Sequence, residues 1–174
     1  LALQFAKIRS EITEEQCDAY VKELKTLPEK IKRILEDKER LQWFASKQAN
    51  AKDIFFIGRG IDYAISLEGS LKMKEISYIH SEAYAAGELK HGTISLIEDG
   101  TLVIGVLTQP KLTTFGNYNT EDTADFTVYI PKTDPHFATS LAVIPLQLLG
   151  YYVSVNKGLD VDKPRNLAKS VTVE

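Results

Sequence analysis

Three charged residues between positions 68 and 75 have types and a spacing that suit catalysis. Glu68, Lys72 and Glu75 follow one another at intervals of four and three residues. A helix therefore places them in one stripe, beside a stripe that holds Leu71 and Tyr78. Two interpretations fit. The charges form salt bridges on a solvated face, worth roughly a few tenths of a kcal/mol each, or a carboxylate is held near ammonium groups at the edge of a pocket and acts as an acid/base.

A second group of polar residues follows Gly87, where the helical pattern stops. Glu88, Lys90 and His91 lie here, in a segment that predicts one short turn within a loop. A lone histidine in a loop is more often a surface residue than a catalyst. The other histidines, His80 and His136, are interpreted as structural.

Metal and cofactor chemistry find no support in the sequence. It contains no HExxH motif, no CxxC pair and no loop rich in Asp and Asn, so we expect neither a metal site nor a cofactor. Cys17 is the only cysteine, which excludes an internal disulfide and fits a reducing, cytoplasmic compartment. It is interpreted as a small buried or half-buried residue of a helix.

A glycine pair precedes the charged helix. Residues 53–58, DIFFIG, predict a buried parallel strand, and residues 61–80 predict a helix, so the turn at 58–60 opens a strand–turn–helix unit. Its backbone N–H groups at a helix start would suit an anion. A dinucleotide-binding fingerprint needs a third glycine where Tyr63 stands. A plain turn therefore remains the alternative.

The elements that must position these residues alternate between helical and strand patterns. Apolar spacing predicts helices over residues 1–8, 14–37 and 40–50, and Pro28 is expected to kink or split the second. Buried strands are predicted at 101–107 and 126–130, and a long apolar helix at 138–155. This alternation predicts an α/β sandwich with a parallel sheet.

The connection between the last two predicted strands does not fit this plan. Residues 108–125 contain Pro110, Gly116, Asn117 and Asn119 and show no helical period. A parallel crossover usually carries a helix of about ten residues or more. Either this connection is unusual, or residues are missing from it.

Composition limits the class of protein. A chain of 174 residues with 44% hydrophobic residues and a net charge of −3 predicts a globular domain without a general attraction to nucleic acid or membranes. No stretch approaches 18 consecutive apolar residues, and no signal-peptide pattern is visible. Residues 1–8 form a helical pattern with no cap residue before it, so we expect further sequence upstream. Residues 158–174 show no period and are expected to be ordered only if they dock.

Three sequence runs closely resemble the second sugar-isomerase (SIS) half of the glucosamine-6-phosphate synthase family. They are LEGSLKMKEISYIHSEAYAAGELKHG at 67–92, IPLQLLGYYVSVNKG at 144–158 and DVDKPRNLAKSVTVE at 160–174. The resemblance implies a three-layer α/β sandwich with a mostly parallel sheet flanked by helices (SIS, flavodoxin-like), preceded by N-terminal helices. It implies a helical segment over 1–50 that leads from a preceding SIS half, a SIS subdomain over 51–157, and a tail over the active site at 158–174.

The resemblance also implies a function. The family makes glucosamine 6-phosphate from fructose 6-phosphate and glutamine, the first step of amino-sugar synthesis, and this chain would be its sugar-isomerase part. The full enzyme would be a homodimer that also contains a glutaminase domain and a first SIS half with a phosphate-binding loop. Neither part is present in this sequence, and Cys17 is not the glutaminase nucleophile. We therefore expect this chain alone to be inactive.

Four residues take roles from the resemblance. Glu75 corresponds to the base that moves a proton between C1 and C2, and Lys72 to a lysine near the reacting end of the sugar. His91 corresponds to the residue that assists ring opening, and it is supplied to the site of the neighbouring subunit. Lys169 corresponds to a tail lysine that contacts the open-chain sugar near its carbonyl. These types suit the chemistry, because imidazoles titrate near neutrality and one carboxylate reaches two adjacent carbons.

Two other functions are alternatives to this one. A non-catalytic SIS module would bind a sugar phosphate and regulate a partner, but it would not need Glu75, His91 and Lys169 together. A plain phosphosugar isomerase would lack the run at 160–174. The sequence also departs from the family in one place, because the family's crossover helix is missing near residues 109–115.

Overall fold

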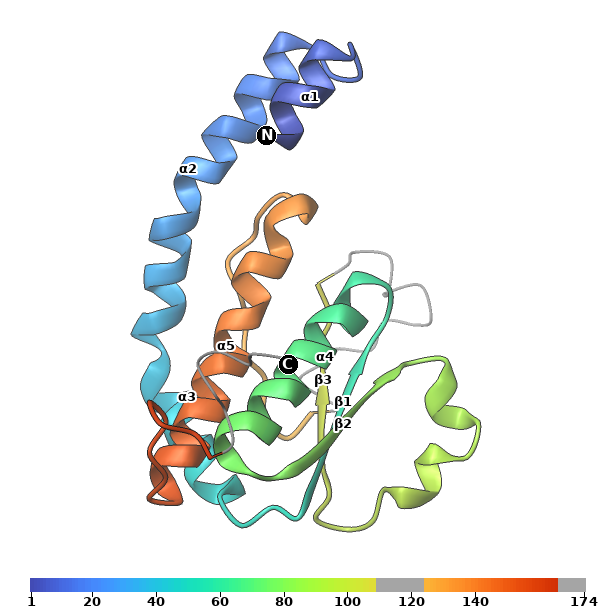
Figure 1. The fold of residues 1–174 in the computed structure, drawn as a ribbon, viewed down its shortest axis with the longest axis vertical. Coiled ribbons are helices and arrows are strands. Elements are labelled where there is room, and N and C mark those ends of the chain that lie inside the picture. The colour runs from blue at the N-terminus through green and yellow to red at the C-terminus, as the bar shows by residue number, and fades with distance from the viewer. Residues whose placement is uncertain (109–123, 166–174) are drawn as a thin grey trace, which may run out of the picture.

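The computed structural model describes residues 1–108 and 124–165, which form an α/β body with a helical arm (Figure 1). The helices are α1 (Ala2–Ile8), α2 (Glu14–Glu36), α3 (Lys38–Gln48), α4 (Ile61–Lys72) and α5 (Pro135–Asn156). The strands are β1 (Asp53–Gly58), β2 (His80–Ala85) and β3 (Leu102–Gly105). Short helical turns follow α4 at Met73–Ser77 and β2 at Glu88–Lys90 and Thr93–Leu96.

A parallel sheet in the order β2-β1-β3 forms the centre of the body. β1 is the middle strand and pairs along its whole length with β2, from Asp53 opposite His80 to Gly58 opposite Ala85. Three consecutive residues of β1, from Ile54 to Phe56, are buried, and Ile54 packs in an apolar core with residues of α3, α4 and α5. These features confirm the predicted α/β architecture with a parallel sheet flanked by helices.

Two glycines let the helices approach one another closely. A Cβ atom added to Gly69 of α4 would lie 2.8 Å from both Leu146 Cδ1 and Phe56 Cε1, closer than side chains pack in proteins. A Cβ atom added to Gly150 of α5 would lie 3.4 Å from Ile76 Cδ1. The missing side chains thus bring α4, α5 and the sheet together and fix the position of the end of α4.

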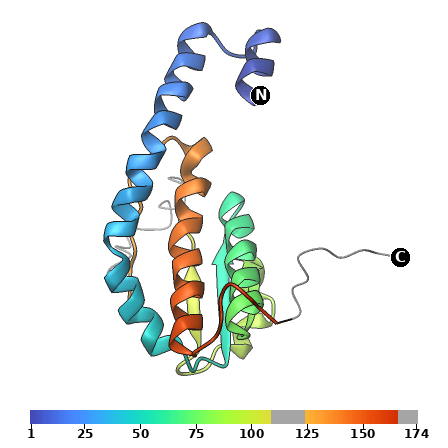
Figure 2. The same ribbon diagram turned by 60° about the vertical axis from the view of Figure 1, so that its left-hand side comes forward.

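α1 and α2 form an arm that extends beyond the α/β body (Figure 1, Figure 2). α2 begins with a capping box, in which the Thr13 hydroxyl accepts from the Gln16 N–H and the Gln16 side chain accepts from the Thr13 N–H. Its C-terminal half joins the body through Leu27 and Ile34, which pack on α5. The helix runs through Pro28, so the alternative prediction of a split at this residue is wrong.

Glu23 of α2 joins the arm to the segment that precedes α5. Its Oε1 atom accepts hydrogen bonds from Lys30 Nζ at 2.5 Å, Thr133 Oγ1 at 2.7 Å and the Asp134 N–H at 3.1 Å. The Lys30 ammonium first, and then the other two donors, lower the pKa of the Glu23 carboxyl to about 2. One carboxylate therefore joins segments that lie 110 positions apart in the sequence.

The protein is expected to lose stability in acid because of Glu23. A carboxyl with a lowered folded-state pKa stabilises the fold fully above its unfolded-state pKa, which is about 4.3. This stabilisation is lost as the pH falls through the folded-state pKa of about 2. Urea midpoints of the wild type should therefore fall more steeply from about pH 5 to pH 2 than those of Glu23→Gln. Glu29→Gln, on the exposed side of the same helix, is the control, and equal slopes for Glu23→Gln and the wild type would contradict the assignment.

The helix predicted over 61–80 ends early, and a strand that the sequence analysis missed follows it. Tyr78 has a φ angle of 55°, in the left-handed region where helices stop. His80–Ala85 then pairs along β1 as strand β2. Its sequence, HSEAYA, contains no apolar alternation that would have indicated a strand. Pairing with the buried strand β1 decides its conformation, because strand preference depends on context.

The predicted strand at 126–130 is wrong, because this segment has no sheet pairing among the described residues. It is attached to α3 instead. The ring of Phe126 stacks on Phe44 with centroids 4.4 Å apart, and Arg40 Nη2 donates to the Thr127 carbonyl at 3.2 Å. A carbonyl that a strand would offer to its neighbour is thus bonded to a side chain.

α5 is long and apolar enough to cross a membrane when judged by length and composition alone. Half of its most apolar stretch is buried inside the protein, where the helix packs on α3 and α4. Core helices of globular proteins have the same length and composition. α5 is therefore the central helix of the α/β body.

Candidate functional site

The end of α4 holds the charged residues that the sequence singled out. Lys72 Nζ donates to Glu75 Oε2 at 2.6 Å and lies 3.7 Å from Glu68 Oε1. The side chains of Lys72 and Glu75 are 30% and 25% exposed, so the pair is half-buried yet open to a ligand. This geometry favours the interpretation of a carboxylate held beside an ammonium group.

Glu75 lies in a single π-helical turn, Met73–Ser77, that continues α4. Such turns contain one residue more than an α-helical turn and are frequent at functional sites. Met73 and Ser77 are buried, and the Ser77 hydroxyl donates to the Met73 carbonyl at 2.6 Å. The wide turn is thereby fixed from the core side, while Glu75 remains accessible.

The electrostatics of the pair suit proton transfer. The Glu75 carboxylate raises the pKa of the Lys72 ammonium, chiefly through the hydrogen bond between them, so Lys72 stays positively charged. Since this bond uses Oε2 of Glu75, the other carboxylate oxygen can face a substrate. A carboxylate in this setting can move a proton between two adjacent atoms.

His91 does not lie beside this pair. It follows the short turn Glu88–Lys90, which confirms the predicted turn, and its side chain is exposed. The His91 N–H donates to the Glu88 carbonyl at 3.0 Å. Figure 1 shows the turn at one end of β2 and the end of α4 at the other. The fold thus separates His91 from Lys72 and Glu75 of the same chain.

Lys169 lies outside the described residues, but the start of the tail contacts the end of the π-helix. The Arg165 N–H donates to the Tyr78 hydroxyl at 2.5 Å, and the Arg165 guanidinium lies over the Tyr78 ring, 5.0 Å from its centre. Sequence reasoning missed this role of Tyr78 and placed it only in an apolar stripe. No sequence signal links the two residues, because they are 87 positions apart.

The remaining histidines each contact an aspartate, and Cys17 has the half-buried setting that the sequence predicted. His80 Nδ1 lies 2.8 Å from Asp53 Oδ1, which joins β2 to β1. His136 Nδ1 lies 2.7 Å from Asp134 Oδ1, at the N-cap of α5. Cys17 is half-buried in α2. None of these contacts places them next to the Lys72–Glu75 pair.

The turn at residues 58–60 is better explained as a plain turn than as an anion site. The Asp62 N–H, at the start of α4, donates to the Arg59 carbonyl at 3.1 Å. The Asp62 side chain is fully buried and accepts from the Thr108 N–H at 3.1 Å and from the Thr108 hydroxyl. The helix start therefore already holds an acidic side chain, which would repel a bound anion.

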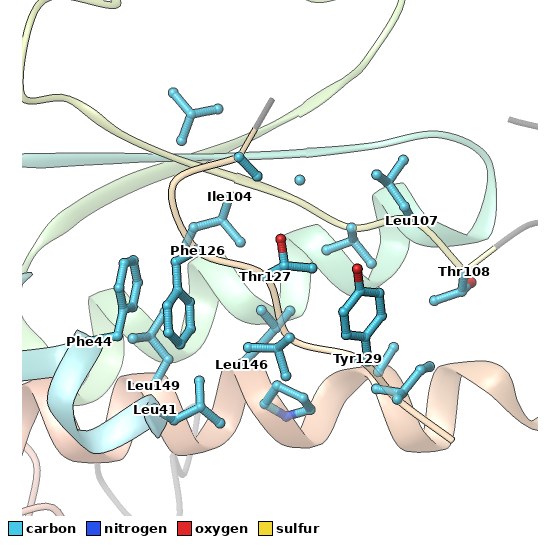
Figure 3. A pocket seen from close by; sticks show the side chains of 18 of the residues that line it. Leu41, Phe44, Ile104, Leu107, Thr108, Phe126, Thr127, Tyr129, Leu146 and Leu149 are labelled. Atoms are coloured by element: carbon cyan, nitrogen blue, oxygen red, sulfur yellow. The ribbon is translucent and has the colours of Figure 1, made fainter. Parts of the chain in front are cut away.

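An apolar pocket of about 350 Å³ lies between α3, β3, α5 and the segment 126–130 (Figure 3). Phe44 and Phe126 stack at one end of it, and Leu146 contributes to its floor. Lys72 and Glu75 do not line this pocket. Recognition of a sugar phosphate needs polar and cationic side chains. The pocket is therefore not the sugar site.

Comparison with known families first gives a similarity for the central part of the chain. Residues 48–115, which contain β1, α4, the π-helical turn and β2, match the family model of the SIS domain. This stretch of the chain is therefore similar to the SIS domain, and in the structure it contributes the parallel sheet and α4 of the α/β fold.

Individual relatives then show a more specific similarity, to aminotransferases. Proteins named glutamine–fructose-6-phosphate aminotransferase (isomerizing) from Caldanaerobacter subterraneus and Clostridium tetani are 49% and 51% identical, over 100% of this chain and 32% of their own length. The solved C-terminal domain of glucosamine-fructose-6-phosphate aminotransferase from Francisella tularensis has a TM-score of 0.82 at 31% identity, over 93% of this chain and 52% of that one. The chain is similar to the C-terminal SIS half of these aminotransferases, which confirms the resemblance.

The chain spans about a third of the length of the curated relatives it matches. The alignments run over 195 positions although the chain has 174 residues, so the relatives carry residues that this chain lacks. Additional residues in the relatives are what the expected gap after the strand at 101–107 requires, and their place in the chain stays a prediction. The segment 109–115 itself lies outside the described residues.

Proposed function

We propose that this chain forms the acid/base side of a sugar-isomerase site in an enzyme that makes glucosamine 6-phosphate from fructose 6-phosphate and glutamine. One observation carries the proposal. Lys72 holds Glu75 in a π-helical turn at a half-buried edge, in a chain similar to enzymes named for this reaction. The proposal includes the division into a helical segment over 1–50, a SIS subdomain over 51–157 and a tail over 158–174, and a cytoplasmic location.

Glu75 is the base in this proposal. Isomerisation moves one proton from C1 of the sugar to C2, and the nitrogen supplied by glutamine stays on C2. The carboxylate takes the proton from C1, holds it and returns it to C2, so one group performs both transfers. Charge that develops along the reacting atoms in between is stabilised by the Lys72 ammonium, which the Glu75 hydrogen bond holds in place.

His91 serves the neighbouring subunit of the proposed homodimer. Within its own chain it lies at the opposite end of β2 from the pair of Lys72 and Glu75, which supports a role in another site. An exposed imidazole on a short turn suits a residue that reaches across an interface. Imidazoles protonate a ring oxygen or accept a hydroxyl proton near neutral pH, which is the chemistry of ring opening.

Lys169 is proposed to contact the open-chain sugar near its carbonyl. Arg165, four positions earlier, is bonded to Tyr78 at the end of the π-helix. Four residues span at most about 14 Å even when fully extended. The contact between Arg165 and Tyr78 therefore supports a tail that stays within reach of Glu75.

The proposed enzyme needs parts that this chain does not span. A first SIS half would hold the phosphate of the sugar, and a glutaminase domain would release ammonia from glutamine. No cofactor or metal ion is required, because side chains and bound ammonia carry out the ring opening, the imine formation and the proton transfer. The partners of this chain are thus the sugar phosphate, the rest of the same polypeptide and a second copy of it.

The proposal is tested with the full-length protein that contains this chain, supplied with glutamine and with fructose 6-phosphate deuterated at C1. We expect glucosamine 6-phosphate to form, with part of the deuterium at C2, because one base performs both transfers. Mass spectrometry and NMR locate the label. A non-catalytic SIS module would bind the sugar phosphate without forming product, and that result would refute the proposed function.

A further inference from the structure

We infer that Tyr78 is a positioning residue that anchors the C-terminal tail beside the proton-transfer site. The inferred effect on the reaction rests on the proposed function, whereas the anchoring itself does not. Tyr78 ends the π-helical turn that carries Glu75, and Arg165 comes immediately before the last stretch of the tail. A contact between these two residues therefore joins the tail to the element that holds the base.

Two independent contacts make up the anchor. The Tyr78 hydroxyl accepts a hydrogen bond from the Arg165 N–H at 2.5 Å. The Arg165 guanidinium lies 5.0 Å from the centre of the Tyr78 ring, within the range of a cation–π interaction. One contact binds the backbone and the other binds the side chain, so together they fix both the position and the orientation of the tail at this residue.

The backbone conformation of Tyr78 would suit glycine better than a bulky residue. Its φ of 55° and ψ of 25° lie in the left-handed region, which is unfavourable for a bulky residue and favourable for glycine. A glycine would end the helix at this point with less strain. The chain has a large aromatic residue instead, and the ring and hydroxyl of that residue both contact Arg165.

The segment before Arg165 directs the tail toward this contact. Gly158, with a φ of 70°, follows the end of α5, and the Leu159 N–H donates to the Ser154 carbonyl at 3.0 Å. The Asp160 carboxylate then accepts from the N–H groups of the next turn, at 3.0 and 3.3 Å. The chain thus turns back from α5 toward the end of the π-helix before it reaches Tyr78.

The anchor brings the last described residue of the tail to the proton-transfer site. Arg165 is seven positions beyond Gly158, and its contact with Tyr78 lies three positions beyond Glu75. Because a shorter tether raises the local concentration of the tail at the site, the anchor favours a tail that acts on the bound sugar.

Limited digestion of the full-length protein with trypsin tests the anchor directly. Trypsin cleaves after Arg165 only when the guanidinium leaves the Tyr78 ring and enters the protease. We expect cleavage after Arg165 to be about ten-fold faster in Tyr78→Gly, which loses both contacts, and intermediate in Tyr78→Phe, which keeps the ring. Tyr151→Ala, at an exposed tyrosine of α5, is the matched control and should match the wild type.

The variant Tyr78→Gly is expected to fold, because glycine readily adopts the left-handed backbone conformation of this position. In the glutamine-dependent assay, we expect kcat of this variant to fall about ten-fold, KM for fructose 6-phosphate to change less, and Tyr78→Phe to recover part of the loss. A thermal unfolding midpoint equal to that of the wild type shows that the loss is not one of stability.

The digestion tests the anchor, and the kinetic assay tests its effect on the reaction. Cleavage of Tyr78→Gly at the wild-type rate overturns the anchor, and faster cleavage with unchanged kcat overturns its role in positioning the tail for the reaction. If the wild-type full-length protein forms no glucosamine 6-phosphate, the proposed function fails. The digestion experiment still decides the anchor in that case, because it does not depend on turnover.

Discussion

Replacing Glu75 by glutamine is expected to lower kcat for glucosamine 6-phosphate formation by about 10²- to 10⁴-fold. Glutamine keeps the size of the side chain and an oxygen that can accept from Lys72, which donates to Glu75 at 2.6 Å. It cannot take a proton from C1. Binding of fructose 6-phosphate should change little, because the proposal assigns the phosphate to another part of the enzyme. Steady-state kinetics and calorimetric titration of the full-length protein measure the two effects separately.

Glu68→Gln is the matched control for this experiment. Glu68 lies on the same helix, at 3.7 Å from the same lysine nitrogen, and its side chain is 40% exposed. Ion pairs of this exposure contribute little, so we expect less than about a three-fold change in kcat. Equal losses in Glu68→Gln and Glu75→Gln would point to the charge around Lys72 instead of proton transfer. Undiminished turnover of Glu75→Gln would remove Glu75 as the base.

Two inactive variants are expected to restore activity when their subunits are mixed. If His91 serves the neighbouring subunit, a mixed dimer of Glu75→Gln and His91→Asn has one site with both replacements and one site with neither. Random pairing of equal amounts makes half of the dimers mixed, so about a quarter of the wild-type activity should return. The measurement is glucosamine 6-phosphate formation after co-expression of two differently tagged full-length chains.

A mixture of Glu75→Gln with Lys72→Ala is the control for subunit exchange. These two residues are hydrogen-bonded within one chain, so every site of the mixed dimer carries one of the replacements and no activity should return. Purification through both tags verifies that mixed dimers form. Activity that stays absent in verified dimers of Glu75→Gln and His91→Asn would show that His91 does not act across the interface.

Helices and strands could be predicted from the sequence where their own residues determine their structure. The apolar spacing of α2 and α5 and the continuous apolar run of β1 required no partner to be recognised. β2 was missed because HSEAYA becomes a strand only through pairing with β1. The segment 126–130 has strand-forming residues, but a side chain of α3 binds its carbonyl. In both cases contacts between distant parts of the chain outweigh local preference.

The same distinction applies to the candidate site. Lys72 and Glu75 are three positions apart on one helix, so their contact follows from helical geometry. The π-helical turn and the left-handed Tyr78 are not visible in the residue pattern. The contact of Tyr78 with Arg165 depends on how α5 and the following turn return to α4, which only the tertiary structure determines.

The π-helical turn Met73–Ser77 also limits how the length of this segment can change. It is equivalent to an α-helix with one inserted residue, so everything after it is rotated by about 100° relative to an uninterrupted helix. α4 packs on β1 before the turn, and the turn itself packs on α5. Deletion of one residue here would undo the rotation and turn Tyr78 away from Arg165. Substitutions around Glu75 are therefore expected to preserve the contact between Tyr78 and Arg165, whereas an insertion or deletion between Lys72 and Tyr78 is expected to break it.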